Sequence, residues 1–397
     1  GSGGAFIAET DSLTIGAFTR STLQRVDANG VAQAASQAGA VEDLVVAGGG
    51  SLVVQLASGN LVVTGGTGTS PAASAVRVAA AGKILLRAAA GTITVNASIA
   101  SVNGNISLIS SGAQTFGADG DVSTGEVSSV AGSIDISTDG ANAAITMDPG
   151  TVVQTSGGNI RIVSGESGTN GGNITLGVLD ARVAADRGAT PTLAGQQTAW
   201  GSVAVEARVG SILDTLSDAI TNVFARSLRL VAGSSSAGTI GASLQAIETE
   251  VFTLSAVAGG AMHLREATSV TVGQSLTASV GRVQGNSATD VATALATGAD
   301  LVAGAIGGAL KADRVLFMTD VAGIYKNYPD EASIIKEISL SGLKEISSQF
   351  KDGMSPKVQA LIHAVENGAQ CSLVFDGRSA QNLETAIHQD IGTKVFA

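Results

Sequence analysis

A short phrase recurs through the first three quarters of the chain: a glycine, a small polar residue, and a run in which apolar and polar side chains alternate. Alternation with a period of two is typical of a strand with one buried face. The glycine allows a turn with positive φ, and an Asn or Ser after it helps to close that turn. The phrase predicts many short strands, and its clearest copies are Gly91-Thr-Ile-Thr-Val95, Gly104-Asn-Ile-Ser-Leu108, Gly132-Ser-Ile-Asp-Ile136, Gly158-Asn-Ile-Arg-Ile162, Gly172-Asn-Ile-Thr-Leu176 and Gly201-Ser-Val-Ala-Val205.

The spacing of these glycines predicts a repeat architecture. Successive glycines are 13, 28, 26, 14 and 29 residues apart, close to one or two multiples of 14. In a solenoid each coil buries its apolar face only by stacking on the next coil, so the sequence keeps a period. We therefore predict a mainly β chain in which residues 1–290 form a right-handed parallel β-helix or a similar β-solenoid. A jelly roll or sandwich is the alternative, although its strands need not keep such a period.

Composition changes near residue 290. Of the 52 glycines, 42 lie before residue 291, whereas seven of the eight lysines follow it. Such a shift is typical of two domains of separate origin. We predict a β-solenoid over residues 1–290 and a small domain of different chemistry over residues 291–397.

Charge and cysteine content exclude several classes of partner. The net charge of −11 argues against nucleic acid and anionic membrane surfaces, since both require basic patches. The single cysteine, Cys371, excludes an intramolecular disulfide and a cysteine-based metal cluster. No apolar run reaches the ~18 residues of a membrane-spanning helix, so no span is expected. The start Gly-Ser-Gly-Gly, without Met or an apolar leader, suggests a processed product or a fragment.

A longer repeat links the two ends of the β-rich region, because Gly3–Gly16 matches Gly259–Gly273 with one inserted residue. Together with shorter phrases, this repeat resembles the secreted adhesins of the filamentous-haemagglutinin type over residues 1–285. The resemblance implies an extracellular or cell-surface scaffold that binds a surface or another protein. The shorter phrases are Gly210-Ser-Ile-Leu-Asp214, Ser227-Leu-Arg-Leu-Val-Ala-Gly233 and Gly238-Thr-Ile-Gly241.

Asp119 and Asp121 are the one hint of a metal site. Their segment, Gly117-Ala-Asp-Gly-Asp121, is similar to the turns of calcium-binding β-rolls. The nonapeptide repeat of such rolls is not sustained here, so a plain polar turn is the favoured interpretation. We predict no metal site in the protein itself.

From Ala299 onward, strands and amphipathic helices alternate. We expect helices at 300–310, 357–367 and 380–388, strands at 314–319, 371–375 and 392–396, a short strand and a helix within 334–346, and an Ala-rich helix at 290–297. This alternation predicts a small α/β layer with a parallel sheet. Ligands of such sheets bind beyond the carboxyl ends of the strands, where Thr319-Asp320 and Asp376-Gly377-Arg378 occur.

Five separated motifs over residues 298–397 resemble the C-terminal, ATP-binding half of the N-acetylglutamate kinases in the amino acid kinase family. The resemblance implies a kinase-like transferase that uses ATP with Mg²⁺ to phosphorylate the N-acetylglutamate carboxylate in arginine biosynthesis, a cytoplasmic activity. The motifs are, in order, Ala299-Asp300, Thr319-Asp320-Val-Ala-Gly323-Ile-Tyr325, Gly353-Met354-Ser-Pro-Lys357-Val358, Asp376-Gly377-Arg378 and Gly392-Thr393.

The resemblance implies roles for individual residues. Lys357 is expected to reach the transferring phosphoryl group and neutralise its charge, and Asp300 to orient the cationic groups around the phosphates. Gly353 and Met354 are expected to shape the loop before the Lys357 helix, whose N-terminus favours anions. Viewed without the motif order, Lys357 is a solvated helix lysine and Asp300 a helix cap. The residues expected to cradle the adenosine are Thr319, Asp320, Gly323 and Tyr325.

The chain also departs from the family pattern. Gly298 occupies the position of a family Asn, and the Lys-x-Gly-Gly loop of the family's N-terminal half is absent, since only Lys83 precedes residue 311. The substrate half is thus missing, and we expect the kinase-like part to be inactive alone. One hypothesis is a fusion chain that retains nucleotide binding. The alternative is an adhesive, structural β-solenoid with an inert C-terminal remnant.

Overall fold

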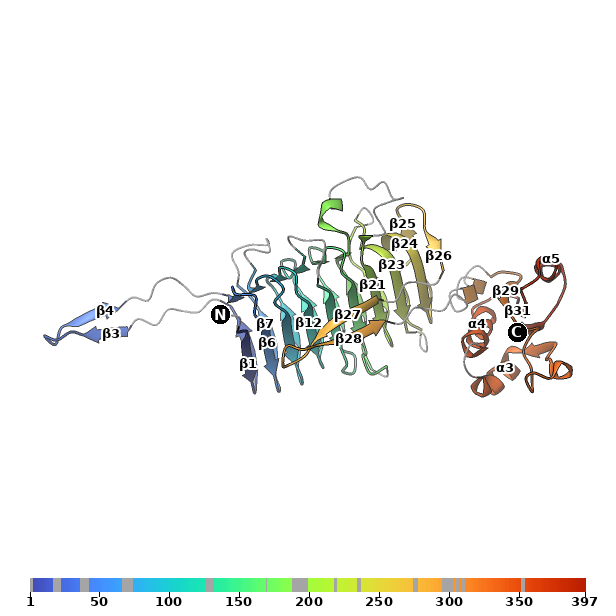
Figure 1. Cartoon of the computed structure of the whole chain (residues 1–397), viewed down its shortest axis with the longest axis horizontal. Helices are drawn as coiled ribbons and strands as arrows, with labels where there is room; N and C mark the ends of the chain where they lie inside the picture. Colours follow the sequence, from blue (N-terminus) through green and yellow to red (C-terminus); the bar gives the residue numbers. More distant parts are fainter. Residues whose placement is uncertain are drawn as a thin grey trace.

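The structure is a computed structural model with two parts of different secondary structure (Figure 1). Short strands dominate up to residue 294, and strands alternate with helices after residue 311. The structure describes residues 3–16, 23–35, 43–65, 74–125, 132–168, 170–187, 199–217, 220–233, 237–273, 278–294, 303–304, 307–308, 311–350 and 354–397.

The first part consists of three ladders of parallel strands, here called the coil stack. Two ladders belong to one 17-stranded sheet and the third is a 7-stranded sheet. Ladder one contains β1 Ala5–Glu9, β6 Leu52–Leu56, β9 Ile84–Ala88, β12 Ile106–Ser110, β15 Ile134–Thr138, β18 Ile160–Ser164, β21 Ser202–Ala207, the second parts of β23 Val223–Ala232 and β24 Ile247–Ala258, and β26 Thr271–Val272.

Ladders two and three contain the other strands of the stack, and one passage of the chain through the ladders is here called a coil. Ladder two contains β5 Leu44–Val46, β8 Val76–Val78, β11 Ile99–Ser101, β14 Val122–Thr124, β17 Val152–Gln154, β20 Val178–Asp180, the first parts of β23 and β24, and β25 Leu264–Glu266. Ladder three contains β2 Leu13–Ile15, β7 Leu61–Val63, β10 Ile93–Val95, β13 Gln114–Phe116, β16 Ile145–Met147, β19 Ile174–Leu176 and β22 Ile212–Asp214.

Parallel pairing confirms the prediction of a mainly β chain with parallel sheets. Every recorded strand pair of these two sheets is parallel, and the same side chain position recurs in register from coil to coil. A jelly roll is built from antiparallel strands, so that alternative is wrong for the described residues. The inward positions form rows of fully buried aliphatic side chains, such as Leu52, Ile84, Ile106, Ile134 and Ile160.

The glycines of the recurring phrase belong to two different sides of the coils. Gly104, Gly132, Gly158 and Gly201 precede strands of ladder one, whereas Gly91 and Gly172 precede strands of ladder three. The intervals of 13 and 14 residues therefore join ladder one and ladder three, and the intervals of 28 and 26 join successive strands of ladder one. The interval of 29, from Gly172 to Gly201, again joins ladder three to ladder one, through the longer segment that contains β20 and the turn Ala184–Asp186. The single period of about 14 residues predicted from the sequence therefore combines intervals between different ladders with intervals along one ladder.

Close approach between coils, and not positive φ, explains five of these glycines, namely Gly91, Gly104, Gly132, Gly172 and Gly201. None of the six adopts a positive φ, which corrects the expected turn geometry. A Cβ on Gly104 would lie 1.9 Å from the carbonyl oxygen of Gly82, and one on Gly132 would lie 2.1 Å from that of Gly104. Any side chain would therefore push the coils apart.

The polar residue after the glycine also acts between coils. The Oδ1 of Asn105 accepts a hydrogen bond from the backbone N–H of Ser133 at 2.9 Å, and Asn159 accepts one from Ser202 at 2.8 Å. Each asparagine thus satisfies a backbone donor of the next coil, whereas we had expected it to close its own turn. The backbone hydrogen bonds of a ladder end where the chain turns toward the next ladder. The asparagine side chains accept hydrogen bonds from the backbone N–H groups at these turns.

Two antiparallel hairpins accompany the coil stack: β3 Leu23–Val26 with β4 Ala32–Ala35, and β27 Ala278–Val283 with β28 Thr289–Ala294. The second, here called the strap hairpin, lies across the strands of ladder one (Figure 1) and contacts β12, β15, β18 and β21. Its β28 corrects the helix expected at 290–297, of which 295–297 lie outside the described residues. Pairing with Ala278–Val283 and packing on the sheet override the helix propensity of the alanines.

Apolar contacts and a buried ionic cluster hold the strap hairpin to the stack. Val283 packs with Val53 and Leu85, and its N–H donates to Ser107 Oγ at 2.9 Å. Arg282 Nε lies 2.5 Å from one oxygen of Asp135, which has no exposed surface. Arg161 and Glu166 complete the cluster. Arg161 Nη1 lies 2.9 Å from Asp135, and Arg161 Nη2 lies 2.8 Å from Glu166.

The second part is a small α/β layer with sheet order β29-β31-β32-β30. Its elements are β29 Val315–Thr319, β30 Glu337–Ser339, β31 Cys371–Asp376, β32 Thr393–Phe396, α3 Leu340–Ile346, α4 Met354–Glu366 and α5 Ala380–His388. Short 3-10 turns occupy Glu331–Ser333 and Ser347–Gln349 in this layer, and Ala184–Asp186 between β20 and β21 in the first part. Of the helix expected at 300–310, residues 303–304 and 307–308 are described and helical.

The strands of this layer are not all parallel, which corrects the expected sheet. β31 pairs in parallel with β29 but antiparallel with β32. The reversal occurs at Gly392, which has a φ of +70° and where a Cβ would lie 2.0 Å from the carbonyl oxygen of Val374. α4 packs on the face of Phe317 and Val374, while α5 packs on the face of Leu373 and Phe375.

Within the described part of the chain, none of the helices combines the length and apolar character that crossing a membrane requires.

Replacing Gly104 with alanine is expected to lower the free energy of unfolding by about 1–3 kcal/mol, the usual cost of overpacking. The added Cβ would collide with the backbone of the preceding coil. Urea unfolding followed by the fluorescence of Trp200, the single and buried tryptophan, measures the change. Gly273→Ala is the control, since nothing lies within 4 Å of its Cβ position. Equal stability of the two variants would contradict the explanation.

Removing the buried carboxylate of Asp135 is expected to destabilise the coil stack by about 3–5 kcal/mol, because both guanidinium groups it pairs with would lose a buried partner. The same fluorescence assay applies to Asp135→Ala. The exposed Asp119 provides the control, Asp119→Ala. A loss below 1 kcal/mol would indicate that the ionic cluster contributes no more than a surface ion pair.

Candidate functional site

Two of the expected motifs meet at one edge of the small sheet. Thr319 and Asp376 are register partners at the carboxyl ends of β29 and β31. The N–H of Gly377 donates to the carbonyl oxygen of Thr319 at 2.8 Å. The prediction that both motifs lie beyond the carboxyl ends of neighbouring strands is therefore confirmed.

A cavity of about 970 Å³ opens beside this edge, here called the larger cavity. Five of the eight expected site residues line it, and they come from the end of β29, the segment 320–335 (the cavity loop) and the first turn of α4. The five are Thr319, Asp320, Tyr325, Met354 and Lys357. Parallel pairing of β29 with β31 and the packing of α4 on both strands bring these distant motifs together.

The other expected site residues do not line the cavity. Gly323 packs against the side chain of Thr393, so its lack of a Cβ serves the packing of the cavity loop. Asp300 and Gly353 lie outside the described residues.

Nine lining residues were missed: Val321 lies inside the Thr319–Tyr325 motif but was given no role, and the other eight lie outside every motif. The nine are Val321, Lys326, Tyr328, Ile335, Glu337, Ile338, Ile346, Gln349 and Phe350. Of these residues, Tyr328 has the clearest signal in the sequence, because it lies three positions after Tyr325 and these are the only two tyrosines of the chain. Their rings pack edge to face with centroids 5.4 Å apart. Ile338 and Ile346 enter the lining through β30 and α3, which only the folded sheet brings close to the motifs.

The lining of the larger cavity combines apolar and polar side chains. The apolar ones include Ile338 of β30, Ile346 of α3, Phe350 of the segment before α4 and Met354 of α4 itself. The polar ones include Thr319, Asp320, Lys326 and Lys357. Such a cavity suits a ligand with a flat apolar part and a charged part.

Asp376 and Arg378 form a fork beside the cavity. Arg378 donates from Nε at 2.9 Å and from Nη2 at 2.6 Å to the two oxygens of Asp376. These hydrogen bonds, and that from the Arg378 backbone N–H, lower the pKa of Asp376 to about 2. Asp376 therefore stays ionised at neutral pH and fixes the direction of Arg378.

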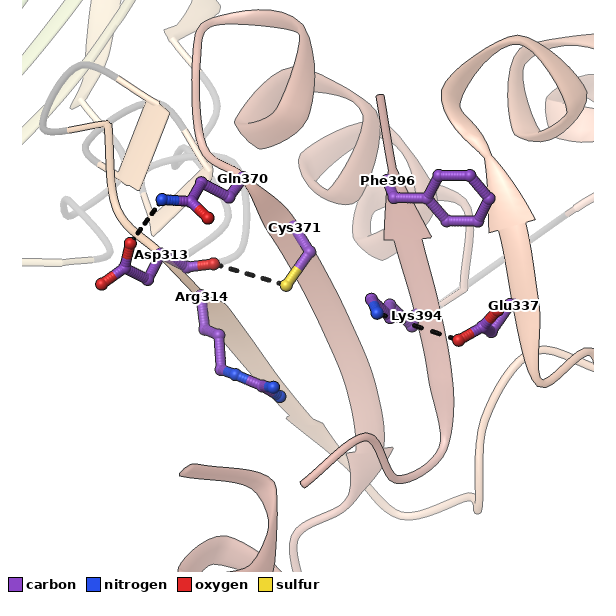
Figure 2. A pocket seen from close by; sticks show the side chains of 7 residues that line it. All are labelled: Asp313, Arg314, Glu337, Gln370, Cys371, Lys394 and Phe396. Carbon is purple, nitrogen blue, oxygen red and sulfur yellow. Dashed lines mark hydrogen bonds and ion pairs between the residues drawn. The ribbon is translucent and has the colours of Figure 1, made fainter. Parts of the chain in front are cut away.

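A second cavity of about 500 Å³ lies at the opposite edge of the sheet, near the start of β31 (Figure 2). Cys371 Sγ donates to the carbonyl oxygen of Asp313 at 3.4 Å, and Gln370 Nε2 donates to the Asp313 carboxylate at 2.6 Å. Arg314 and Lys394 both pair with Asp390, at 2.8 and 2.7 Å. Burial raises the pKa of the Cys371 thiol, so it is not an activated nucleophile.

The described residues contain no group of three His, Cys, Asp or Glu side chains that could hold a metal ion. Asp121, considered above for calcium, accepts a hydrogen bond from the backbone N–H of Val152 at 2.7 Å and thus links two coils.

Comparison with known proteins points to one family. The sequence profile of the amino acid kinase family matches residues 137–376, a range that begins in β15 and ends at the last residue of β31. The acetylglutamate kinase of Arthrobacter sp. (strain FB24) is 38% identical over 99 residues, which cover 24% of this chain and 32% of that protein. The acetylglutamate kinase of Cutibacterium acnes is 39% identical over 97 residues, which cover 24% of this chain and 31% of that protein.

This chain thus spans about a third of the length of the curated relatives it matches. Among solved structures, N-acetylglutamate synthase from Neisseria gonorrhoeae, complexed with coenzyme A and L-arginine, matches with a TM-score of 0.23 and 17% identity over 25% of this chain and 23% of that one. A protein of Aeropyrum pernix K1 matches with a TM-score of 0.24 and 24% identity over 30% and 37% of the two chains.

The Asp376 carboxyl is expected to titrate near 2, and Arg378→Ala is expected to move its midpoint up toward the ordinary value of about 3.9. Because the pKa is lowered in the folded state, the fork stabilises the protein above about pH 4 and loses this effect as the pH falls toward 2. NMR titration of the carboxyl carbon measures both midpoints. Asp390, whose pKa Lys394 lowers, is the internal control and should not respond.

Proposed function

The chain belongs to the amino acid kinase family, and we propose that its C-terminal α/β layer binds ATP in the larger cavity. The observation that carries the proposal is that Lys357, Asp320 and Thr319 line one cavity of about 970 Å³ together with several apolar side chains. A purine ring needs an apolar wall, and a triphosphate needs cations beside it. The curated relatives over this region are acetylglutamate kinases, which supports a nucleotide as the ligand.

Lys357 has the position that a phosphate-binding lysine requires. It lies in the first turn of α4, and the N-terminus of this 13-residue helix carries the positive end of the helix dipole. Phosphoryl transfer depends mainly on positioning and on neutralising the charge of the transferring group. We propose that Lys357 neutralises this charge, while Phe350 and Met354 contact the base.

Asp320 fits the Mg²⁺ that accompanies ATP. Mg²⁺ keeps several waters and is held by phosphate oxygens and one or two carboxylates, so a dedicated protein cage is not needed. Asp320 lines the larger cavity and accepts a hydrogen bond from Thr319 Oγ1 at 3.2 Å. When bound, Mg²⁺ would neutralise phosphate charge, and Asp320 would supply a carboxylate oxygen to hold it.

We further propose that transfer to the carboxylate of N-acetylglutamate requires a second half that this chain does not cover. The matched relatives are about three times longer than the matched region. Holding both reactants in place can supply about 7–11 kcal/mol of a barrier reduction, and half a site cannot do this. The C-terminal part alone is expected to bind ATP without turnover.

For the first part of the chain we propose a parallel β-helix with a structural role, joined as a fusion to the kinase-like part near residue 290. Three ladders of parallel strands, close glycine contacts between coils and rows of buried aliphatic side chains support this proposal. A secreted or surface adhesin with an inert C-terminal remnant is the alternative function, favoured by the predominance of the coil stack.

An ATP titration by calorimetry on the whole chain distinguishes the two functions. Saturable binding is expected, and Lys357→Ala should weaken it about 10- to 100-fold, since a hydrogen bond to a charged group contributes about 1.5–3 kcal/mol. Lys344→Ala is the matched control, because Lys344 lies on α3 and pairs with Glu366 at 2.7 Å, outside the cavity lining.

Absence of binding by the unmodified chain would contradict the nucleotide proposal and favour the structural alternative. Binding that both lysine variants weaken equally would indicate attraction of ATP to positive charge in general and would contradict the specific role of Lys357.

A further inference from the structure

One buried hydroxyl group joins the last strand of the small sheet to the cavity loop. Thr393, the first residue of β32, has no exposed surface. Its Oγ1 accepts a hydrogen bond from the N–H of Ile324 at 2.7 Å and donates one to the carbonyl oxygen of Ile335 at 2.6 Å. The N–H of Ile335 also donates to the carbonyl oxygen of Ile324 at 2.8 Å. Thr393 therefore holds the early and the late part of the cavity loop together.

Two glycines make room for this arrangement. A Cβ on Gly323 would lie 2.7 Å from Thr393 Oγ1, so a side chain there would displace the hydroxyl or the loop. Gly392 has a φ of +70° and turns the chain so that Thr393 enters β32 opposite Val374. Packing against the hydroxyl thus explains Gly323, and positive φ with close approach to Val374 explains Gly392, in both cases without a ligand contact.

The cavity loop supplies much of the lining of the larger cavity. Asp320 and Val321 come from its start, Tyr325 directly follows Ile324, and Tyr328 packs against Tyr325. Ile324 packs in the core with residues of α4, and Ile335 belongs to the same core while also lining the cavity. A shift of Ile324 would therefore carry Tyr325 with it and alter the cavity wall.

We infer that Thr393 is a positioning residue of the larger cavity, which acts through the cavity loop and does not itself line the cavity. Its hydroxyl sets where Asp320 and Tyr325 lie relative to Lys357. A buried hydroxyl with both a donor and an acceptor partner is costly to replace, because both partners would remain unsatisfied. The nucleotide part of this inference rests on the proposed function, whereas the part about the loop does not.

The test compares two substitutions of Thr393. Thr393→Val removes the hydroxyl at nearly constant volume, and Thr393→Ser retains it. Ser372→Ala is the matched control, since Ser372 is also fully buried and donates to the carbonyl oxygen of Leu361 at 3.1 Å, on the helix side of the neighbouring strand. Two quantities are measured on the whole chain below the melting temperature of each variant: amide hydrogen exchange over residues 320–335 and the Kd for ATP.

Thr393→Val is expected to speed exchange at Ile324 and Tyr325 and to raise the Kd for ATP, each about tenfold. Thr393→Ser should restore both values. Ser372→Ala should lower the melting temperature and change neither, which separates positioning from a merely structural role. If Thr393→Val does not fold, Gly323→Ala, whose Cβ presses on the same hydroxyl, should give the same pattern.

Unchanged exchange in the cavity loop of a folded Thr393→Val variant would overturn the inference whatever the ATP result. Faster exchange with an unchanged Kd would overturn it as well, since the loop would then move without affecting the cavity. If the unmodified chain binds no ATP, the proposed function fails, and the exchange data alone decide whether Thr393 positions the loop.

Discussion

Each coil of the stack satisfies its backbone hydrogen-bonding groups on the coils before and after it, and this requires the two backbones to come very close at the corners. Gly82, Gly104 and Gly132 lie on top of one another there, with room for hydrogen atoms only. The rows of buried Leu, Ile and Val side chains depend on this spacing, because a wider corner would separate them. Asparagines such as Asn105 and Asn159 bind backbone donors of the next coil at the same places.

The outer face of ladder one carries apolar side chains, and another segment of the chain covers them. A sheet with apolar residues on both faces must be covered on both. The strap hairpin supplies the cover, with Val283 over Val53 and Leu85 and with Arg282 beside the buried Asp135. Lys83, the single lysine of the first 310 residues, donates to the carbonyl oxygen of Ser287 in the turn of this hairpin at 2.9 Å. Its role is therefore structural.

The small α/β layer brings short motifs from distant positions in the chain to one cavity. The parallel pair β29 and β31 places the ends of two strands side by side, and α4 brings Lys357 to the same region. The antiparallel β32 then enters from the opposite direction and brings Thr393 under the cavity loop. A fully parallel sheet, as expected from the alternation of strands and helices, would have placed Thr393 at the other edge.

The sequence by itself determined the local features: strands at the glycine phrases, the change of composition near residue 290, and the helices of Lys357 and Ala380. These depend on side-chain periodicity within a few residues, which does not change on folding. Only the tertiary structure decided which coil Gly104 contacts, that Thr289–Ala294 pairs as a strand, that β32 is antiparallel, and that Tyr328 and Phe350 line the cavity. These outcomes depend on contacts between residues far apart in the chain, and burial against a distant partner outweighs local propensity.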